Sequence, residues 1–594
     1  MPRPMSLATK PKNFGKTVRN LLTNLKPWRV LIIASMILTV ASVILALFGP
    51  MILGQVTTEA VRSYTETGAI DWGVISSLMI QLILLYVGSS ILNYLQGVAL
   101  SVVTESYGKQ LRDEIIKKIG RLPVSYFDKH QFGDTLSRMS NDVDAITQSM
   151  ARILSEVISD IVKLIGIFVM MMVISVPLSL VALLILPLSF LSISQLAKKA
   201  QAYFRTNRTT LGELNSSIEE DYAGQSIIKA NSHEMLSAKK FEAQNQRLFE
   251  TGWKAQFFSA LAFPIIHVLT NLGYAVICVM GGGMVISGKL AIGSIQAFIQ
   301  YVSQFNQPIQ GVSQIASNIQ STLAAVERVY GFLEEPDETP DPEPALTISD
   351  VRGAVEFNHV DFAYDPAKPI IRDFSVKIEP GMQVAIVGPT GAGKTTIINL
   401  LMRFYDPQSG YIAIDGVPTR EMKRADVRKL FGMVLQDTWL FSGTIEENLR
   451  YGRPNATHED ILRATKASSI HHFIESLPHG YKTEIAEDSD NISAGEKQLL
   501  TIARAMVANP PMMILDEATS NVDTRTEQLI QDAFAKLTKG RTSFVIAHRL
   551  STIRNSDLIL VMRDGAIVEQ GKHEELLAMD GFYAELYNSQ FADS

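Results

Sequence analysis

Four stretches of this chain, each longer than 30 residues, contain no Asp, Glu, Lys or Arg. They are residues 72–104, 164–197, 255–288 and 290–326. About 20 apolar residues are enough to cross a bilayer as a helix, and a helix satisfies its own backbone groups where no water is present. The alternative, a buried soluble helical bundle, does not need runs of this length. The front of the chain therefore predicts membrane-spanning helices.

We expect an α-helical membrane domain of six spans over residues 1–330. A further apolar stretch precedes these four runs. The run 164–197 is too long for one span, and Pro177 near its middle predicts two helices joined by a tight turn. The expected helices lie near residues 30–54, 72–104, 155–176, 177–197, 255–287 and 290–326.

The distribution of Lys and Arg predicts the orientation of this domain. Basic residues are frequent in the N-terminal tail and in segments 105–163 and 198–254, whereas the loop 55–71 has only Arg62. Because cytoplasmic loops carry the excess of Lys and Arg, we expect both termini and the two long connections in the cytoplasm, and the protein in the cell membrane. The net charge of −6 gives no basic field for nucleic acid, and the single cysteine, Cys278, excludes an internal disulfide.

A stretch rich in Pro and acidic residues, 334–344, marks a domain boundary. Its composition predicts a segment that neither packs nor stays helical. We assign residues 331–350 to this linker and residues 351–594 to a soluble α/β domain that follows it.

Residues 388–395, Gly-Pro-Thr-Gly-Ala-Gly-Lys-Thr, have the spacing of a phosphate-binding loop. Such a loop surrounds nucleotide phosphates with backbone N–H groups, while Lys394 reaches the β- and γ-phosphates and Thr395 holds Mg²⁺. An apolar strand expected at 384–387 precedes the loop and a helix expected at 396–402 follows it, which is the context that the motif needs. The loop residues expected to bind ATP are Gly388, Pro389, Thr390, Gly391, Ala392, Gly393, Lys394, Thr395 and Thr396.

A pair of carboxylates follows a second apolar strand. Residues 511–515 lead directly into Asp516 and Glu517. Asp516 would hold Mg²⁺, and Glu517 would polarise the attacking water. An Asp-Glu pair by itself is more often a solvated turn, but the strand before it and the phosphate loop in the same chain favour the catalytic interpretation.

The order and spacing of these motifs resemble the ATP-binding-cassette family, in particular exporter-type half-transporters whose membrane domain precedes the cassette. The resemblance covers nearly the whole chain and implies a P-loop ATPase that uses ATP and Mg²⁺. It also implies roles for isolated residues that would otherwise be assigned to surface or core. Tyr364 is expected to stack on adenine, Gln436 to sense Mg²⁺, and His548 to contact the γ-phosphate.

Residues 491–496, Asn-Ile-Ser-Ala-Gly-Glu, occupy the place of the family signature, usually LSGGQ. In this family the signature of one subunit caps the ATP held by the phosphate loop of the other, so the chain is expected to work as a dimer. The resemblance assigns Ser493, Gly495 and Glu496 to the partner's ATP and Asp523 to a loop between the subunits.

The altered signature predicts a heterodimer with a second half-transporter. Ala494 adds a methyl group where the backbone must approach phosphate, and Glu496 places a carboxylate near an anion unless it points away or is paired. In the family, a subunit that combines good catalytic carboxylates with a poor signature is typical of heterodimers. A homodimer with a tolerated variant signature is the alternative.

Two segments, near residues 125–144 and 213–230, resemble the cytoplasmic coupling segments of these exporters. They would pass the movement of the cassettes to the membrane helices. Without the resemblance, both would be interpreted as solvated helical faces.

The function implied by the resemblance is ATP-driven export of amphipathic small molecules by alternating access, with drugs as the first candidate. A lipid flippase or a peptide exporter is the alternative in the same class. An ATP-binding regulatory or channel-like protein is the alternative in a different class, and the intact Lys394, Asp516, Glu517 and His548 argue against it.

Glutamines recur every three or four residues in the last expected span. At this spacing they fall on one face of a helix, where amides are unfavourable against lipid. We expect this face to line the translocation cavity, and an interhelical amide seam is the alternative. The residues assigned to the cavity are Gln296, Gln300, Gln304 and Gln307.

Overall fold

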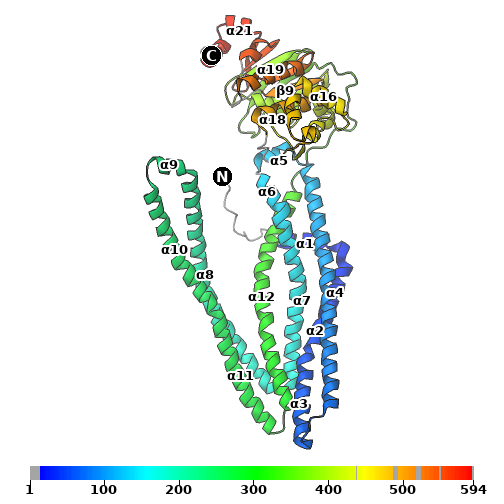
Figure 1. The fold of residues 1–594 in the computed structure, drawn as a ribbon, viewed down its shortest axis with the longest axis vertical. Helices are drawn as coiled ribbons and strands as arrows, with labels where there is room; N and C mark the ends of the chain where they lie inside the picture. The colour runs from blue at the N-terminus through cyan, green and yellow to red at the C-terminus, as the bar shows by residue number, and fades with distance from the viewer. Residues whose placement is uncertain are drawn as a thin grey trace. The chain divides into compact units, whose positions relative to one another are not determined.

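The computed structural model describes residues 14–130, 132–435, 438–485, 492–516, 523–547 and 550–591. The chain divides into two compact units (Figure 1). The first unit comprises Met1–Gly120 and Phe132–Glu335, and the second comprises Arg121–Gln131 and Pro336–Ser594. The short segment Arg121–Gln131 therefore belongs to the second unit, although the chain on both sides of it belongs to the first.

The first unit consists of helices. In chain order they are α1 (Phe14–Asn24), η1 (Lys26–Trp28), α2 (Arg29–Leu47), α3 (Gly49–Thr67), α4 (Trp72–Ile119), α6 (Phe132–Ser137), the π-helical turn η2 (Arg138–Asp142), α7 (Val143–Ile174), α8 (Val176–Ala223), α9 (Gln225–Ala230), α10 (Glu234–Ala260), α11 (Ala262–Ile286) and α12 (Ile292–Leu333). The helices α4 and α8 each contain 48 residues. At 1.5 Å per residue each is about 70 Å long, which exceeds the thickness of a bilayer.

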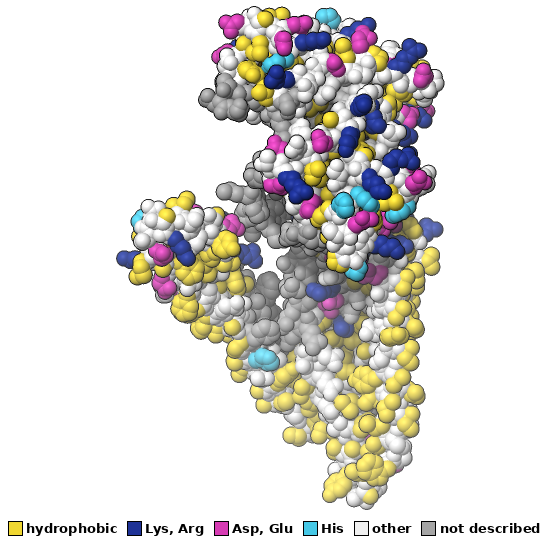
Figure 2. Space-filling model, turned by 45° about the horizontal axis from the view of Figure 1, so that its top comes forward, with side chains coloured by type: hydrophobic (Ala, Val, Ile, Leu, Met, Phe, Trp, Pro, Cys, Tyr) yellow, Lys and Arg dark blue, Asp and Glu magenta, His cyan; other side chains and the backbone are white. Residues whose placement is uncertain are grey.

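The apolar helices agree with the composition of the front of the chain. Among the described residues, four helical stretches are long and apolar enough to cross a membrane: Lys26–Thr67, Trp72–Ile119, Thr135–Ile174 and His267–Ile286. Between α7 and α8 the extended residue Ser175 interrupts the helix, and Pro177 lies in the first turn of α8, where a missing N–H costs no hydrogen bond. Hydrophobic side chains dominate the long helices in the space-filling view, whereas charged ones are frequent on the second unit (Figure 2).

Helices α3 and α12 come into backbone contact. A Cβ atom added at Gly293 would lie 1.6 Å from the carbonyl oxygen of Gly54, so only glycine fits there. The N–H of Gly293, in the first turn of α12, donates to Thr58 Oγ1 at 3.1 Å. Close by, the hydroxyl of Tyr301 donates to the carbonyl of Leu47 at 2.5 Å. These contacts hold α12 against the α2–α3 bend.

Helices α8, α9 and α10 form a long hairpin that diverges from α4, α7 and α12 within the first unit (Figure 1). Tyr203 of α8 and Phe258 of α10 stack with their ring centroids 5.6 Å apart. The side chain of Asn207 donates to the carbonyl of Leu248 at 3.1 Å. The hairpin is therefore held together by its own two long helices.

The second unit contains two main sheets. The antiparallel sheet has the order β2 (Ile371–Ile378), β1 (Val355–Phe362), β4 (Ser409–Ile414), β5 (Val417–Pro418). The other sheet has the order β12 (Ala566–Gly571), β11 (Leu558–Arg563), β3 (Gln383–Val387), β10 (Thr542–Ile546), β9 (Met512–Asp516), β6 (Phe431–Val434). All its neighbours are parallel except β11 and β12. Its inner strands are apolar without alternation, as expected for strands buried on both faces.

The remaining elements of this unit are mostly short helices. They are α5 (Val124–Lys129), α13 (Lys394–Leu401), η3 (Thr419–Glu421), α14 (Arg424–Lys429), α15 (Ile445–Arg450), α16 (His458–Ala467), α17 (His471–Ser476), η4 (Gly480–Lys482), α18 (Ala494–Ala508), α19 (Thr524–Thr538), α20 (Leu550–Arg554), α21 (His573–Ala578) and α22 (Phe582–Phe591), with the strand pair β7 (Gly443–Thr444) and β8 (Glu484–Ile485).

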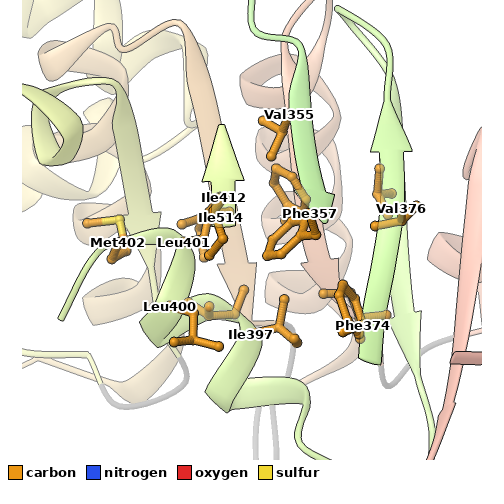
Figure 3. Packing of buried hydrophobic residues seen from close by; sticks show 14 of the residues in the cluster. Val355, Phe357, Phe374, Val376, Ile397, Leu400, Leu401, Met402, Ile412 and Ile514 are labelled. Carbon is orange, nitrogen blue, oxygen red and sulfur yellow. The ribbon is translucent and has the colours of Figure 1, made fainter. Parts of the chain in front are cut away.

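The core between the two sheets fixes helix α13. Ile397 of α13 is 1 % exposed and belongs to one apolar cluster with Phe357, Phe374 and Ile514 (Figure 3). The rings of Phe357 and Phe374 meet edge to face, with centroids 5.1 Å apart. Because α13 directly follows residues 388–393, this packing also fixes the end of that loop.

The acidic linker packs against the second unit, and the expectation that it does not pack is wrong. Residues 334–344 form no helix in the structure, yet Glu338 and Asp341 lie 3.2 and 3.1 Å from the guanidinium of Arg424. The side chain of Arg424 is only 8 % exposed. A buried guanidinium needs acceptors and opposite charge, and the linker carboxylates supply them. Composition alone did not reveal that a buried cation was available.

Candidate nucleotide site

The loop 388–393 forms a cradle that side chains would fill. Gly388 has φ +154°, and a Cβ atom there would lie 2.4 Å from the carbonyl oxygen of Met562. Gly393 has φ +100°, and a Cβ atom there would lie 2.7 Å from Ile371 Cδ1. The N–H of Ala392 donates to the carbonyl of Pro389 at 3.2 Å. The N–H groups of the first turn of α13 have no partner within the helix, and the helix dipole favours an anion at that end.

Lys394 closes the cradle on one side. Its Nζ donates to the carbonyl oxygens of Gly388 at 2.7 Å and of Pro389 at 3.1 Å. Burial lowers the pKa of the Lys394 ammonium, and the negative charge of Asp516 opposes this shift. The ammonium group is held at the loop by carbonyl oxygens, which phosphate oxygens of a nucleotide could replace.

Thr395 and Asp516 come together although 121 positions separate them in the chain. Both line a small cavity of about 100 Å³ at the start of α13 and the end of β9. A hydroxyl and a carboxylate are oxygen ligands of the kind that Mg²⁺ prefers. Over the described ranges, no group of three His, Cys, Asp or Glu side chains could hold a metal alone. The two residues therefore fit a Mg²⁺ ion whose coordination is completed by phosphate oxygens and water.

Tyr364 stands beside α13 and is 39 % exposed. Its hydroxyl accepts a hydrogen bond from Asn399 Nδ2 at 3.1 Å and donates to Thr396 Oγ1 at 3.4 Å. Phe362 and Tyr405 contact the ring edge to face, with centroids at 4.9 and 5.0 Å. The Tyr364 ring is held in place, and a nucleotide base next to the phosphate cradle could stack on it.

Three of the expected site residues, Gln436, Glu517 and His548, lie outside the described residues. The strands that lead to two of them are described. Strand β9 ends at Asp516 and β10 ends at Ile546, and these two end residues are paired in register. Strand β3, which leads into the phosphate loop, is paired with β10 on its other side. The described strands therefore end at the same edge of the sheet as the cradle.

The signature residues lie at the start of α18. The hydroxyl of Ser493 donates to Glu496 Oε2 at 2.6 Å, and the N–H of Ser493 donates to the same oxygen at 2.9 Å. The N–H of Glu496 in turn donates to Ser493 Oγ at 3.4 Å, which completes a capping box. The carboxylate of Glu496 is thus paired with Ser493, and Gly495 is buried in the first turn.

Asp523 caps the start of α19. Its carboxylate accepts the backbone N–H groups of Arg525 at 3.1 Å and Thr526 at 3.0 Å. The hydrogen bond from Thr526 is the largest cause of a lowered pKa for this carboxyl. Within one chain, Asp523 is a helix cap, and this arrangement does not test its expected place between subunits.

The glutamine face of α12 is only partly described. Gln296 Oε1 accepts a hydrogen bond from Thr57 of α3, which is the arrangement of the alternative amide seam. Gln300 is half-buried and Gln304 is exposed. The side chain of Gln307 lies outside the described part of the structure. Gln296 thus makes the kind of contact that a seam would make, and the cavity interpretation stays a prediction for all four glutamines.

One contact near the site could not be predicted from the sequence patterns. The hydroxyl of Tyr405, four residues after the end of α13, donates to the carboxylate of Asp128 in α5. Asp128 lies in a segment that the resemblance marked for coupling, but no spacing rule connects residues so far apart in the chain. Only the fold places them together.

Two family models match the chain. The ABC transporter transmembrane region matches residues 32–309, and the ABC transporter model matches residues 371–520. A protein of Mycobacterium bovis named fatty acid ABC transporter ATP-binding/permease protein is 42% identical, with coverage of 97% of this chain and 96% of that protein. An ATP-dependent lipid A-core flippase of Syntrophus aciditrophicus is 34% identical over 86% of this chain and 85% of its own length.

A similar solved structure is that of a bacterial Atm1-family ABC exporter with ATP bound. Its TM-score is 0.71 at 27% sequence identity, and the superposition covers 96% of this chain and 98% of that chain. The likeness includes both units.

Proposed function

The chain belongs to the ATP-binding-cassette family as an exporter that carries its transmembrane region and its cassette in one polypeptide, and on that premise we propose that it moves amphipathic molecules across the cell membrane by alternating access in a dimer. It is a membrane-embedded, ATP-hydrolysing transporter. The observation that carries the proposal is the phosphate cradle, which the start of α13 and the end of β9 complete. The cassette and both termini would face the cytoplasm, where ATP is present.

The residues of this chain have different roles at the ATP site. Backbone N–H groups of residues 388–395 and the ammonium of Lys394 bind the phosphates, and Tyr364 orients the base. Thr395, Asp516 and Gln436 would hold Mg²⁺, which supplies charge neutralisation at the phosphates when bound. Glu517 would polarise the attacking water, and His548 would contact the γ-phosphate.

Two exposed apolar surfaces support a dimer. The free end of the α8–α10 hairpin exposes Tyr222 by 85% and Met235 by 84%, and Figure 2 shows hydrophobic side chains there beside charged ones. On the second unit, Trp439 is 71% and Tyr451 is 63% exposed. Apolar side chains gathered in this way mark contacts with another protein. We propose that the hairpin end of one subunit docks on this aromatic surface of the other.

The aromatic surface is held in shape before any partner arrives. Arg504 donates to the carbonyl oxygens of Asn448 at 2.8 Å and Trp439 at 2.9 Å. Its guanidinium also lies 5.8 Å from the ring centroid of Tyr451. A preformed surface loses little conformational entropy on docking, which suits a contact that must transmit movement.

We propose that the partner is a different half-transporter. Glu496 is already paired with Ser493, so a γ-phosphate approaching this signature must displace a carboxylate that holds the serine hydroxyl. Such a signature would cap a weak site, while the phosphate loop of this chain forms the strong site with the partner's signature. Expression of this chain alone tests the idea, because robust cargo-stimulated ATPase from the pure homodimer would contradict it.

The cargo proposed is a molecule with an apolar chain and a polar head. Two relatives carry names for such molecules, a fatty acid and lipid A-core. These names give lipid-like cargo more weight than the drugs expected first. A regulatory or channel-like protein would need no cargo-stimulated hydrolysis.

The experiment is ATP-driven transport in vesicles with the dimer purified through a tag on this chain, so that its native partner subunit is retained. Three probes separate the cargo classes: NBD-labelled stearic acid, NBD-labelled phosphatidylethanolamine and Hoechst 33342. We expect vanadate-sensitive ATPase and movement of at least one probe, with no movement in the Glu517→Gln variant. If wild-type protein hydrolyses ATP but moves none of the three, and none raises the rate, the proposed transport of amphipathic molecules is refuted.

A further inference from the structure

The acidic linker is attached to the second unit through two arginines. Arg428 Nη2 lies 3.0 Å from Glu338 Oε1, and Arg424, which is buried, makes the larger number of contacts. Arg424 Nη2 donates to Asp406 Oδ2 at 2.9 Å, besides its contacts with Glu338 and Asp341. Arg424 Nη1 donates to the backbone carbonyl of Thr339 at 2.6 Å. Three carboxylates from two separate segments thus share one guanidinium. We call Glu338, Asp341, Asp406 and Arg424 the linker clamp.

The linker clamp includes the segment that follows the phosphate-loop helix. Arg403, two residues after the end of α13, has φ +49°, a conformation that ordinary residues rarely adopt. Its buried side chain donates to Asp406 at 3.0 Å and to the carbonyl of Met422 at 2.6 Å, which holds the backbone in that conformation. Asp406 therefore has a fixed place relative to α13. A rare conformation that the surroundings enforce in this way often accompanies function.

The same short segment touches α5. Tyr405 lies between Arg403 and Asp406 in the chain, and its hydroxyl donates to Asp128. Its ring also meets the edge of Tyr364, which is expected to bind adenine. Residues 403–406 are thus connected to the linker through Arg424, and they contact α5 and the aromatic residue of the ATP site directly.

The linker leaves little slack between α12 and the clamp. Glu338 is only five residues beyond Leu333, the end of α12, so the connecting chain can span at most about 18 Å when fully extended. The N–H of Glu338 also donates to the carbonyl of Arg121 at 2.8 Å, which restricts it further. Once the chain between Leu333 and Glu338 is fully extended, any further shift of the end of α12 must pull on Arg424.

We propose that Arg424 is a positioning residue for transport-coupled ATP hydrolysis, because it makes the linker a second mechanical connection between the membrane helices and residues 403–406. The inference rests on the proposed transport function. Arg424 touches neither nucleotide nor cargo in this scheme. It acts by holding Glu338 and Asp341 to Asp406, so that the position of α12 is communicated to α13 and Tyr364 in addition to the signal through α5.

The test removes the linker side of the clamp and leaves the cassette side intact. In the double variant Glu338→Gln and Asp341→Asn, Arg424 still pairs with Asp406, so the cassette retains its buried ion pair. The control is Glu343→Gln with Asp350→Asn, two exposed carboxylates of the same stretch, which removes the same charge. Both variants are made in the full chain and purified as the dimer.

The first readout is the amount of probe moved per ATP hydrolysed in vesicles, with the probe that the wild type moves fastest among NBD-stearic acid, NBD-phosphatidylethanolamine and Hoechst 33342. We expect the clamp variant to lose at least about fivefold in this ratio, while its basal ATPase and its affinity for MANT-ATP stay within about twofold. The control variant should match the wild type in all three quantities. A merely structural clamp would lower basal ATPase and affinity together and leave the ratio unchanged, which would overturn the inference.

The second readout does not depend on activity. Hydrogen exchange of the peptide covering residues 336–346 should be at least about tenfold faster in the clamp variant than in the control. Equal exchange rates in the clamp variant and the control would mean that Arg424 does not hold the linker. That result would contradict this inference and leave the proposed function standing. If the wild type moves no probe, the proposed function fails and this inference fails with it. As a second variant, Arg424→Lys keeps the charge without the planar fork and should lower the coupling ratio in the same direction.

Discussion

Replacing Gly388 by Ala tests whether the cradle seen in the structure is what binds the nucleotide. A Cβ atom at this position would lie 2.4 Å from the carbonyl oxygen of Met562, whereas contacts below 3.0 Å are essentially never seen. Met562 is fully buried in β11 and cannot yield. The loop must therefore retreat by at least the difference between 3.0 and 2.4 Å, or 0.6 Å.

Two costs follow from that geometry. Alanine at φ +154° adds backbone strain of about 1–3 kcal/mol to the folded state. The retreat also displaces the N–H groups that face the phosphates, and misplacement of such groups by up to about 1 Å costs tenfold or more. We expect the affinity for MANT-ATP with Mg²⁺, measured by fluorescence titration of the purified protein, to fall by about tenfold or more.

The matched control is Gly381→Ala. Gly381 has φ +79°, so alanine is strained there as well, but no atom lies within 4 Å of the added Cβ. This variant should lose thermal stability and keep its affinity for MANT-ATP. The reasoning is refuted if the Gly388 variant binds within twofold of the wild type, or if the Gly381 variant loses as much affinity.

Three further outcomes are expected. Glu517→Gln should keep MANT-ATP binding and lower ATPase by about 10² or more, because the base that polarises water is lost, and near-normal turnover would refute the assignment. Asp523 has a lowered pKa in the folded state. The stability that it adds is therefore present above the ordinary pKa of an aspartate and disappears as pH falls through the lowered value. The Asp523→Asn variant can still cap α19, and its melting temperature should fall less than that of the wild type as the pH is lowered. Cysteines at Gln300 and Gln304 on a Cys278→Ala background should react with a water-soluble thiol reagent without nucleotide, and protection of both would exclude the cavity interpretation.

Local rules were enough for part of the site. The loop 388–395 could be recognised because its glycines, Lys394 and Thr395 act through backbone geometry that a short sequence determines. The apolar stretches could be recognised because a bilayer demands about 20 apolar residues in a row. In both cases the physical requirement lies within one continuous segment.

Contacts between residues far apart in the sequence could not be predicted, because no single continuous segment contains both partners. The acidic linker has the composition of a solvated tether, and only the buried Arg424, more than 80 positions away, explains why it packs. Tyr405 and Asp128 are 277 residues apart. Gln296 shares the helical spacing of the other glutamines, but it accepts a hydrogen bond from Thr57 of α3. Partners of this kind depend on tertiary contacts that periodicity does not encode.

The glycine contact between α3 and α12 determines where the membrane unit can open. Gly54 and Gly293 meet through their backbones, and Thr58 of α3 satisfies the N–H of Gly293 that the first turn of α12 leaves free. Separating the helices here would break that hydrogen bond. We therefore expect this junction to act as a fulcrum, with helix rearrangement during the transport cycle greatest far from it. Any side chain larger than hydrogen at either glycine would wedge this fulcrum apart.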